Sequence, residues 1–285
     1  MQEEFSDSIF KYFANLIEKE TGIQYDEANR YLLLSRLQNL IKFLNFPDVL
    51  SLWNDIQKNG LNQAAKLLIL DTATNNETSF FRDPKVFDFF KNHFVTNVMA
   101  QNPKIRIWCA ATSTGQEPYT IAMIMAELKA QGLTKPYELL GTDISDRVLK
   151  QAASGTFSQL EIQRGLPANL MIKYFEQIVV ESSSMPIYKA KPELSAFMTF
   201  KQMNLLHDWP NFGTFDIIFC RNVLIYQGKE NKKNIIARFA NVLNPGGYLI
   251  LGGAESLLQL SDDFDFETHG NICVHRLKAS VKPYS

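Results

Sequence analysis

The sequence predicts an α/β protein in which an all-helical N-terminal domain precedes a mostly parallel sheet. Residues 5–70 carry helical periodicity with no strand pattern. From about residue 104, apolar strand-like runs such as IRIWCA, YELLGTDI and FDIIFCRN alternate with helical runs. Strands separated by helices form right-handed crossovers, which place successive strands parallel. We therefore expect a helical domain over 1–70, a connector over 71–84 and an α/β domain over 85–285.

The individual elements follow from local signals. In the helical region, the helix predicted within FKYFANLIEKETGI ends at Gly22, and the helix predicted within NRYLLLSRLQNLIKFLNF ends before Pro47. In NNETSFFRDP, Asp83 followed by Pro84 predicts a capped helix start, so the residues before them form an extended connector. Residues 156–197 fit the alternation poorly and predict an insertion with one helix and a short hairpin. FDFETH and NICVHRL have no helix between them and predict an antiparallel pair at a sheet edge.

Composition narrows the classes of function. The 285 residues are 46% hydrophobic and 21% charged, which is typical of a globular chain. The formal net charge of −1 gives no overall attraction to nucleic acid, so we expect no nucleic-acid partner. The N-terminus MQEEFSDSIF lacks the basic region of a signal peptide, and no apolar run reaches about 20 residues. These features predict a cytoplasmic protein without membrane insertion. Nothing in the sequence predicts an oligomer, so a monomer is the default expectation.

Cysteines and histidines offer no metal-ligand spacing. Cys109, Cys220 and Cys273 are scattered in apolar runs, which favours buried thiols in a reducing compartment. The four histidines form no HxxxH or mixed cysteine–histidine motif. The sequence therefore predicts no metal.

The loop after the first predicted strand, ATSTGQEPYT, indicates a ligand site. Its small residues let the backbone approach a ligand, and the following helix offers N–H groups. Gly115 is its only glycine, so it matches neither a dinucleotide fingerprint nor a P-loop. Asp143, after the second strand, suits two ribose hydroxyls, although strand-end aspartates also cap helices.

The chemistry of these residues favours S-adenosylmethionine (SAM) over NAD. SAM has no phosphate and so needs no glycine-rich cradle. Glu117 is placed to meet its ammonium group, and Arg82 is placed to meet its carboxylate. Cys220, Arg221 and Asn222 end a later strand and lie where the other end of the ligand is expected.

Seven stretches together resemble the CheR family of chemotaxis receptor methyltransferases. They are NNETSFFRDP, CAATSTGQEPYTIAM, LLGTDIS, FSQLEIQRGLP, TFKQMNLL, FDIIFCRNVLIY and LNPGGYLILGGAES. The resemblance runs from the N-terminal helices to about Glu255 and implies a Rossmann-like SAM-dependent methyltransferase sheet. It implies transfer of methyl groups from SAM to glutamate side chains on the cytoplasmic domain of receptors, giving methyl esters and S-adenosylhomocysteine.

The resemblance also assigns site residues by motif. At the cofactor it implies Asn76, Thr78, Arg82, Glu117, Asp143, Asn204, Leu205, Arg221 and Asn222. It implies Tyr226 as the residue that lines the transfer site beside Arg82. Two departures stand out: GQEPYT where the family commonly has GEEPYS, and NVLIYQGKE where an acidic residue usually follows NVLIYF.

The second predicted helix carries Arg30, Arg36 and Lys42 with no acidic residue between them. This pattern favours either a solvated face or a docking face for the glutamates of a receptor.

Three other functions stay open at this stage. The first is a SAM-binding regulator without transfer activity. The second is a methyltransferase that acts on nucleic acid or a small molecule, which the net charge disfavours. The third is a nicotinamide oxidoreductase, which the single-glycine loop disfavours.

Overall fold

The structure is a computed structural model that describes residues 5–99, 102–133, 135–179 and 185–281. Its contacts divide the chain into two compact units. The first is Met1–Asn75 with Tyr226–Lys232, and the second is Asn76–Ile225 with Lys233–Ser285. The domain bounds derived from the sequence stay a prediction, and the return of residues 226–232 to the first unit was not foreseen.

The first unit is helical, as predicted. It contains α1 (Asp7–Thr21), η1 (Glu27–Asn29), α2 (Arg30–Leu44), α3 (Val49–Asn59) and α4 (Gln63–Ala73). Gly22 ends α1 in the left-handed conformation (φ 73°), which glycine adopts at little cost. Side chains of Ser6, Asp48 and Asn62 accept backbone N–H groups at the starts of α1, α3 and α4. The buried core includes Phe13, Ile17, Leu37, Leu40 and Leu52.

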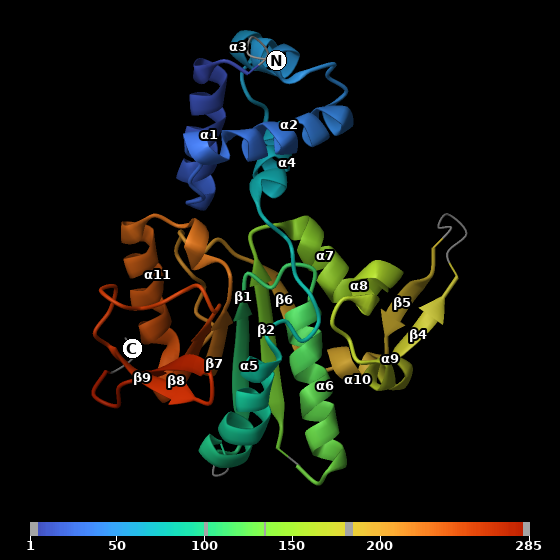
Figure 1. Ribbon diagram of the computed structural model, residues 1–285, viewed down its shortest axis with the longest axis vertical. Coiled ribbons are helices and arrows are strands. Elements are labelled where there is room, and N and C mark those ends of the chain that lie inside the picture. The colour runs from blue at the N-terminus through green and yellow to red at the C-terminus, as the bar shows by residue number, and fades with distance from the viewer. Residues whose placement is uncertain (1–4, 100–101, 134, 180–184, 282–285) are drawn as a thin grey trace. The chain divides into compact units, whose positions relative to one another are not determined.

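The second unit is built on a seven-stranded sheet of order β6-β2-β1-β7-β8-β10-β9 (Figure 1). The strands are β1 (Ile105–Ala110), β2 (Tyr137–Asp143), β6 (Met198–Gln202), β7 (Phe215–Cys220), β8 (Leu243–Leu251), β9 (Phe264–His269) and β10 (Ile272–Leu277). β6, β2, β1, β7 and β8 pair in parallel, and β10 pairs antiparallel with β8 and β9. The predicted antiparallel pair at the sheet edge is therefore confirmed.

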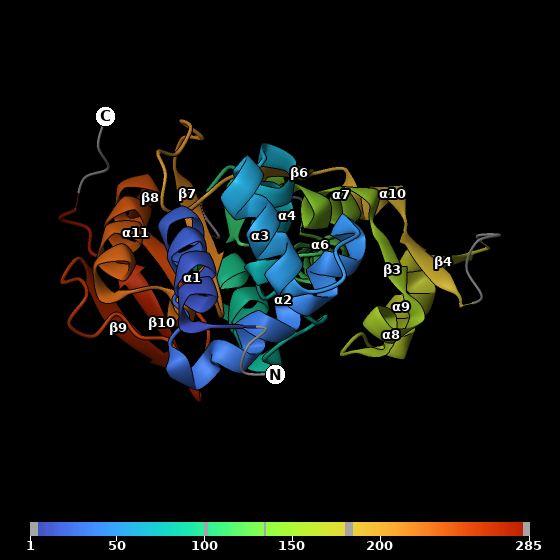
Figure 2. The ribbon, with the colours of Figure 1, turned by 90° about the horizontal axis from the view of Figure 1, so that it is seen from above.

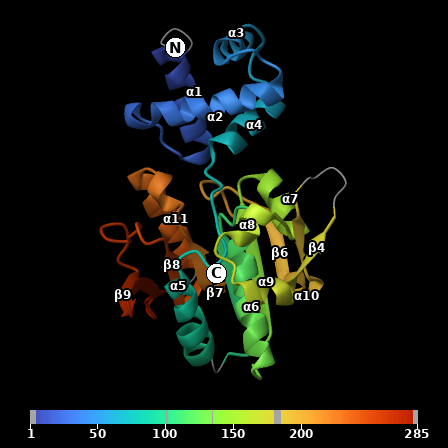
Figure 3. The same cartoon turned by 45° about the vertical axis from the view of Figure 1, so that its right-hand side comes forward.

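Helices cover both faces of this sheet. α5 (Pro84–Phe89), its π-helical continuation η2 (Phe90–Val98) and α6 (Gln116–Ala130) share a core with Ile107 and Cys109. α5 and α6 lie side by side on this face in Figures 1 and 3. α11 (Lys229–Val242) shares the opposite core with Trp108 and Ala110. Successive β1 residues thus enter opposite cores, as the period of a strand requires.

The insertion over 156–197 is more structured than predicted. It holds β3 (Thr156–Ser158), α8 (Gln159–Gln163), α9 (Ala168–Tyr174), β4 (Phe175–Ile178), β5 (Ile187–Ala190) and α10 (Pro192–Ser195). The strands form a separate antiparallel sheet of order β3-β5-β4. Figures 1 and 2 both place this small sheet beyond α7 (Asp146–Ser154), at the end of the main sheet away from β9. The predicted helix corresponds to α9 and the predicted hairpin to the antiparallel pair of β4 and β5. The additional elements β3, α8 and α10 were not predicted, because elements of three to five residues carry little periodicity.

Two further predictions need correction. Asp83 has no capping hydrogen bond to α5 and adopts a left-handed conformation (φ 57°), although Pro84 does open the helix. Cys109 and Cys220 are buried, but Cys273 is exposed. Burial raises the pKa of both buried thiols well above the usual value, so these two cysteines remain protonated.

Candidate functional site

The predicted site residues of the second unit gather at the carboxyl edge of the parallel strands. Glu117 opens α6 just after β1, and Asp143 is the last residue of β2. Asn204 and Leu205 follow β6, and Arg221 and Asn222 follow β7. Because β6, β2, β1 and β7 are neighbours and parallel, these residues share one edge of the sheet.

The loop between β1 and α6 is held in an unusual conformation. Ala111, Ser113 and Gly115 all have positive φ, at 58°, 52° and 100°. A Cβ on Gly115 would lie 3.1 Å from Cα of Ala152, so only glycine fits without displacing α7. Positive φ at non-glycine residues costs free energy and is concentrated at ligand sites. The loop conformation therefore supports a binding role.

Asp143 fixes this loop to the end of β2. Its carboxylate accepts hydrogen bonds from Ser113 N (2.8 Å) and Ser145 N (3.0 Å) and is 5% exposed. A carboxylate offers about four acceptor positions, so this arrangement is compatible with ribose hydroxyls as well. The structural interpretation of Asp143 is therefore confirmed, and its ligand-binding role stays a prediction.

The buried side chain of Arg221 is the centre of an ion-pair network. Its guanidinium contacts the carboxylates of Glu117 (2.8 Å) and Asp83 (2.6 Å) and donates to the carbonyl of Arg82 (2.7 Å). The Arg221 side chain is 3% exposed. Asp83 therefore pairs with Arg221 instead of capping α5, and the network joins the connector to β7 and α6.

Glu255, for which the sequence predicts no role, holds the ends of β7 and β8 together. Its carboxylate accepts from the backbone N–H groups of Asn222 (2.7 Å), Val223 (2.9 Å), Ile225 (3.2 Å) and Gly252 (2.7 Å). A Cβ on Gly252 would lie 2.8 Å from Oε2 of Glu255, which explains the glycine. The sequence signal was the motif GGAES, where two glycines precede an acidic residue.

Several buried polar atoms at this edge lack a hydrogen-bond partner. Among the described residues, they are Thr112 Oγ1, Arg221 Nε and Asn222 Oδ1. A buried polar atom without a partner costs free energy unless a ligand or water satisfies it. Arg221 Nε is a donor, Asn222 Oδ1 is an acceptor, and the Thr112 hydroxyl can be either. This combination matches the mixed donors and acceptors of a nucleoside. The residues present therefore fit an adenosine-type cofactor.

The connector is anchored beside this edge. Phe80 is buried against Phe157 and Phe175, and Phe81 N donates to Thr120 Oγ1 (3.1 Å). The carbonyl of Asn76 accepts from Ser113 Oγ (2.8 Å), which links the connector to the β1–α6 loop.

Two other predicted connector residues are half-buried. The Arg82 guanidinium donates to the carbonyl of Glu77 (3.2 Å), and Thr78 lies between these residues along the chain. Asn76, Thr78 and Arg82 thus belong to the first residues of the second unit.

The remaining predicted residues belong to the helical unit. Tyr226 Oη accepts from Asn75 Nδ2 (2.8 Å), and the Tyr226 carbonyl accepts from Gln24 N (3.2 Å). Its predicted place beside Arg82 stays a prediction.

The three basic residues on α2 differ in their surroundings. Arg30 pairs with Asp7 (2.6 Å) and Glu27 (3.2 Å), and Arg36 donates to Tyr25 Oη and the carbonyl of Ala73. Lys42 is exposed. Positions six apart differ by about 240° around a helix, so these residues point to three different sides of α2.

Comparison with known sequences agrees with this architecture. The family model described as "CheR methyltransferase, SAM binding domain" matches residues 76–272. The model "CheR methyltransferase, all-alpha domain" matches residues 8–71. The two models together span the helical region and the sheet. The chain therefore belongs to the CheR methyltransferase family, and its larger domain is a SAM-binding domain.

Curated relatives match nearly the whole chain. The chemotaxis protein methyltransferase of Vibrio parahaemolyticus is 34% identical over 275 residues, covering 96% of this chain and 98% of the relative. Chemotaxis protein methyltransferase 1 of Pseudomonas aeruginosa is 32% identical over 276 residues, covering 94% and 97%. Among solved structures, a magnesium protoporphyrin IX methyltransferase from Synechocystis is 14% identical, with a TM-score of 0.38, covering 86% of this chain and 95% of that one. This last likeness is too weak to add to the assignment.

No helix in the described ranges combines the length and the apolar character needed to cross a membrane.

Proposed function

We propose that the protein transfers methyl groups from SAM to glutamate side chains on the cytoplasmic domain of methyl-accepting chemotaxis receptors. The observation that carries this proposal is the polar constellation at the carboxyl edge, where Asp143, Glu117 and Arg221 meet the β1–α6 loop. The names of the relatives, which are chemotaxis protein methyltransferases, support the same function. The products are glutamate methyl esters and S-adenosylhomocysteine.

The proposed cofactor-binding roles combine the contacts described above with what the resemblance to the family implies. Asp143 accepts the ribose hydroxyls, while Asn222 Oδ1 and the segment at Asn204 and Leu205 meet the adenine. Glu117 meets the ammonium group, and Asn76, Thr78 and Arg82 close the site from the connector. Arg221 holds Glu117 in place through their 2.8 Å ion pair. When bound, SAM supplies an electrophilic methyl group.

The chain itself has to position the reactants and exclude water. A glutamate side chain is ionised near neutral pH, so its oxygen attacks without a general base. Alignment of oxygen, methyl carbon and sulfur lowers the barrier by several kcal/mol, and by about 7–11 kcal/mol at best. Arg82 and Tyr226 orient the substrate carboxylate, which is costly to desolvate alone.

Methyl transfer with labelled SAM and receptor cytoplasmic fragments tests the function. The enzyme should place base-labile methyl groups on receptor glutamates, released as methanol in alkali. Arg82→Ala should lower turnover by on the order of 100-fold or more, with its free energy of unfolding little changed. Lys85→Ala, an exposed neighbour in α5, is the matched control. S-adenosylhomocysteine binding without methanol release would indicate a regulator without transfer activity, and unfolding of Arg82→Ala would assign Arg82 a structural role.

Receptor docking was predicted for Arg30, Arg36 and Lys42, but they point to three sides of α2, and Arg30 and Arg36 are bound within the helical unit. Docking is therefore tested first at Lys42. Lys42 is exposed, so Lys42→Glu changes charge without breaking a bond within the helical unit. We expect a higher KM that depends on salt, by a factor of about 2–5, because exposed ion pairs contribute up to about 1 kcal/mol. Lys58→Glu, equally exposed on α3, is the control. Equal KM values for both variants would exclude docking through Lys42.

A further inference from the structure

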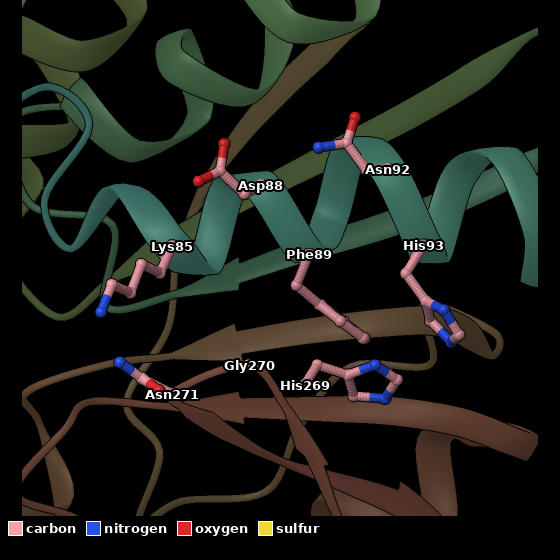
Figure 4. A pocket seen from close by; sticks show the side chains of 8 residues that line it. All are labelled: Lys85, Asp88, Phe89, Asn92, His93, His269, Gly270 and Asn271. Carbon is pink, nitrogen blue, oxygen red and sulfur yellow. The ribbon is translucent and has the colours of Figure 1, made fainter.

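A second polar cluster lies on β9, which is the edge strand of the main sheet at the end of the strand order opposite to β6. It consists of His93 from η2 with Glu267 and His269 from β9, all half-buried. Figure 4 shows the His93 and His269 imidazoles beside each other, with Phe89 next to them. Among the described residues, this is the group of histidine, cysteine and acidic side chains whose ligand atoms come close enough to hold a metal ion.

The fold brings these residues together from distant parts of the chain. Glu267 and His269 are two apart on β9, so their side chains share one face of the strand. Their partners across the antiparallel pair are Val274 and Ile272, which pack in the core beneath α5 and η2. His93 lies one turn after Phe89 on that same helical segment, and the Phe89 ring stacks on the His93 ring with centroids 5.3 Å apart.

The distances within the cluster suit a small divalent ion. His269 Nε2 lies 3.2 Å from Glu267 Oε2, and the rings of His93 and His269 have centroids 4.2 Å apart. One ligand atom from each residue falls within 4.8 Å of the others. In a tetrahedral zinc site with bonds of about 2.0–2.1 Å, ligand atoms are about 3.3 Å apart. Small side-chain rotations therefore complete the site.

Two further side chains orient the carboxylate of Glu267. Tyr248 Oη donates to Glu267 Oε2 (3.0 Å), and Arg276 Nη1 lies 3.4 Å from Glu267 Oε1. Partners of this kind fix metal ligands and tune their affinity. The alternative is that Arg276 and Tyr248 are simply ion-pair and hydrogen-bond partners of a surface glutamate. That alternative leaves unexplained why a second imidazole, that of His93, comes within 4.8 Å of both Glu267 and His269.

The cluster also borders a cavity of about 400 Å³. Its lining includes His93, His269, Asp88 and Asn92, so both imidazoles face a space that water can enter. Three protein ligands leave one tetrahedral position vacant for water. The cavity provides room for that water on the side of α5 and η2.

We propose that His93, Glu267 and His269 bind a divalent transition-metal ion of the zinc type. Two imidazoles and one carboxylate are a ligand set that zinc accepts, and imidazole favours it over magnesium or calcium. The sequence predicted no metal because residues 93, 267 and 269 show no ligand spacing along the chain. The bound ion links the β9–β10 pair to η2. This site is separate from the carboxyl edge and does not depend on the proposed methyl transfer.

Calorimetric titration of zinc chloride into the metal-free full chain, without an affinity tag, tests the site. We expect one zinc ion per chain, with affinity at least tenfold weaker in His93→Ala and His269→Ala. Tyr248→Phe keeps the ring and removes the hydroxyl, and it should weaken binding by about tenfold. His207→Ala, an exposed histidine elsewhere, and Cys273→Ser, an exposed thiol on β10, should bind like the wild type.

Thermal unfolding with and without zinc provides a second readout in each variant. Zinc should raise the Tm of the wild type and both controls, but not of His93→Ala or His269→Ala, each compared with its own metal-free form. Tetrahedral visible absorption of the cobalt(II) form would add support. Absence of zinc binding in the wild type, or wild-type affinity in both histidine variants, would overturn the proposal. Loss of binding in either control would do the same.

Discussion

At the carboxyl edge of the main sheet, Asp143 accepts hydrogen bonds from the backbone N–H groups of Ser113 and Ser145, and Glu255 accepts them from Asn222, Val223, Ile225 and Gly252. At the β9 edge, the hydrogen bonds of Glu267 come instead from the side chains of Tyr248, His269 and Arg276. Backbone donors are fixed by the fold, whereas side-chain donors move with their rotamers. The first region is therefore organised before a ligand arrives, and the second can adjust around an ion.

The largest effect should come from breaking the buried network at the carboxyl edge. Arg221→Met leaves the carboxylate of Glu117, whose side chain is 14% exposed, without its buried cationic partner. We expect the free energy of unfolding to fall by about 3–5 kcal/mol, measured by urea denaturation. In the matched control, Lys150→Met breaks the exposed pair with Asp146 and should cost less than about 1 kcal/mol.

A double variant separates the ion pair from the packing of Arg221. If Glu117→Gln is combined with Arg221→Met, part of the lost stability should return, because no carboxylate is left unpaired at position 117. Equal losses for the Arg221 and Lys150 variants would contradict the view that this edge is held by buried charge.

The next largest effect should follow from weakening the Glu255 carboxylate. Glu255→Gln keeps the shape but turns an NH₂ group toward backbone donors, so we expect a loss of about 2 kcal/mol in the free energy of unfolding. The control is Glu193→Gln, an exposed position in α10, with a change within about 0.5 kcal/mol. Full stability of Glu255→Gln would show that the four N–H groups do not need the charge.

A smaller, pH-dependent effect should arise on β10, beside the β9 edge. Burial lowers the pKa of His275 below the usual 6.5, and a hydrogen bond to the backbone of Leu249 raises it by a smaller amount. The unfolded chain therefore takes up a proton before the folded chain does, and stability is lost as pH falls through about 6.5. The slope is at most about 1.4 kcal/mol per pH unit.

His275→Gln removes this titration, so its stability should fall less steeply with pH than that of the wild type. Part of the slope will remain, because burial also lowers the pKa of His93. Urea denaturation at several pH values between about 5.5 and 7.5 measures the difference. Identical slopes would indicate that His275 is not protonated on unfolding in this range.

Much of the carboxyl edge could be predicted because its residues sit in contiguous motifs. A strand followed by a small-residue loop and a helix places the ligand side of the sheet, and GTDIS places Asp143 on it. The all-helical region was predictable from periodicity, and the antiparallel strand pair from two strand-like runs with no helix between them. These features depend on local sequence.

The missed features depend on contacts between distant residues. Asp83 was expected to cap a helix, but the buried guanidinium of Arg221, 138 residues away, takes its carboxylate. The hydrogen bonds from backbone N–H groups to Glu255 join segments that no spacing rule connects. The same holds for the cluster of His93 with Glu267 and His269. In the small sheet, the pair of β4 and β5 matches the predicted hairpin, but β3 was missed because a strand of three residues is too short to show a period.

The measurement that tests the central claim most directly is calorimetric binding of S-adenosylhomocysteine. The wild type should bind in the micromolar range, and Asp143→Asn should bind about 10–100-fold more weakly, because hydrogen bonds to a charged acceptor contribute about 1.5–3 kcal/mol. Asp146→Asn, exposed in the first turn of α7, should bind like the wild type. Absence of binding by folded wild-type protein, or equal affinities for all three proteins, would contradict a nucleoside site at this edge.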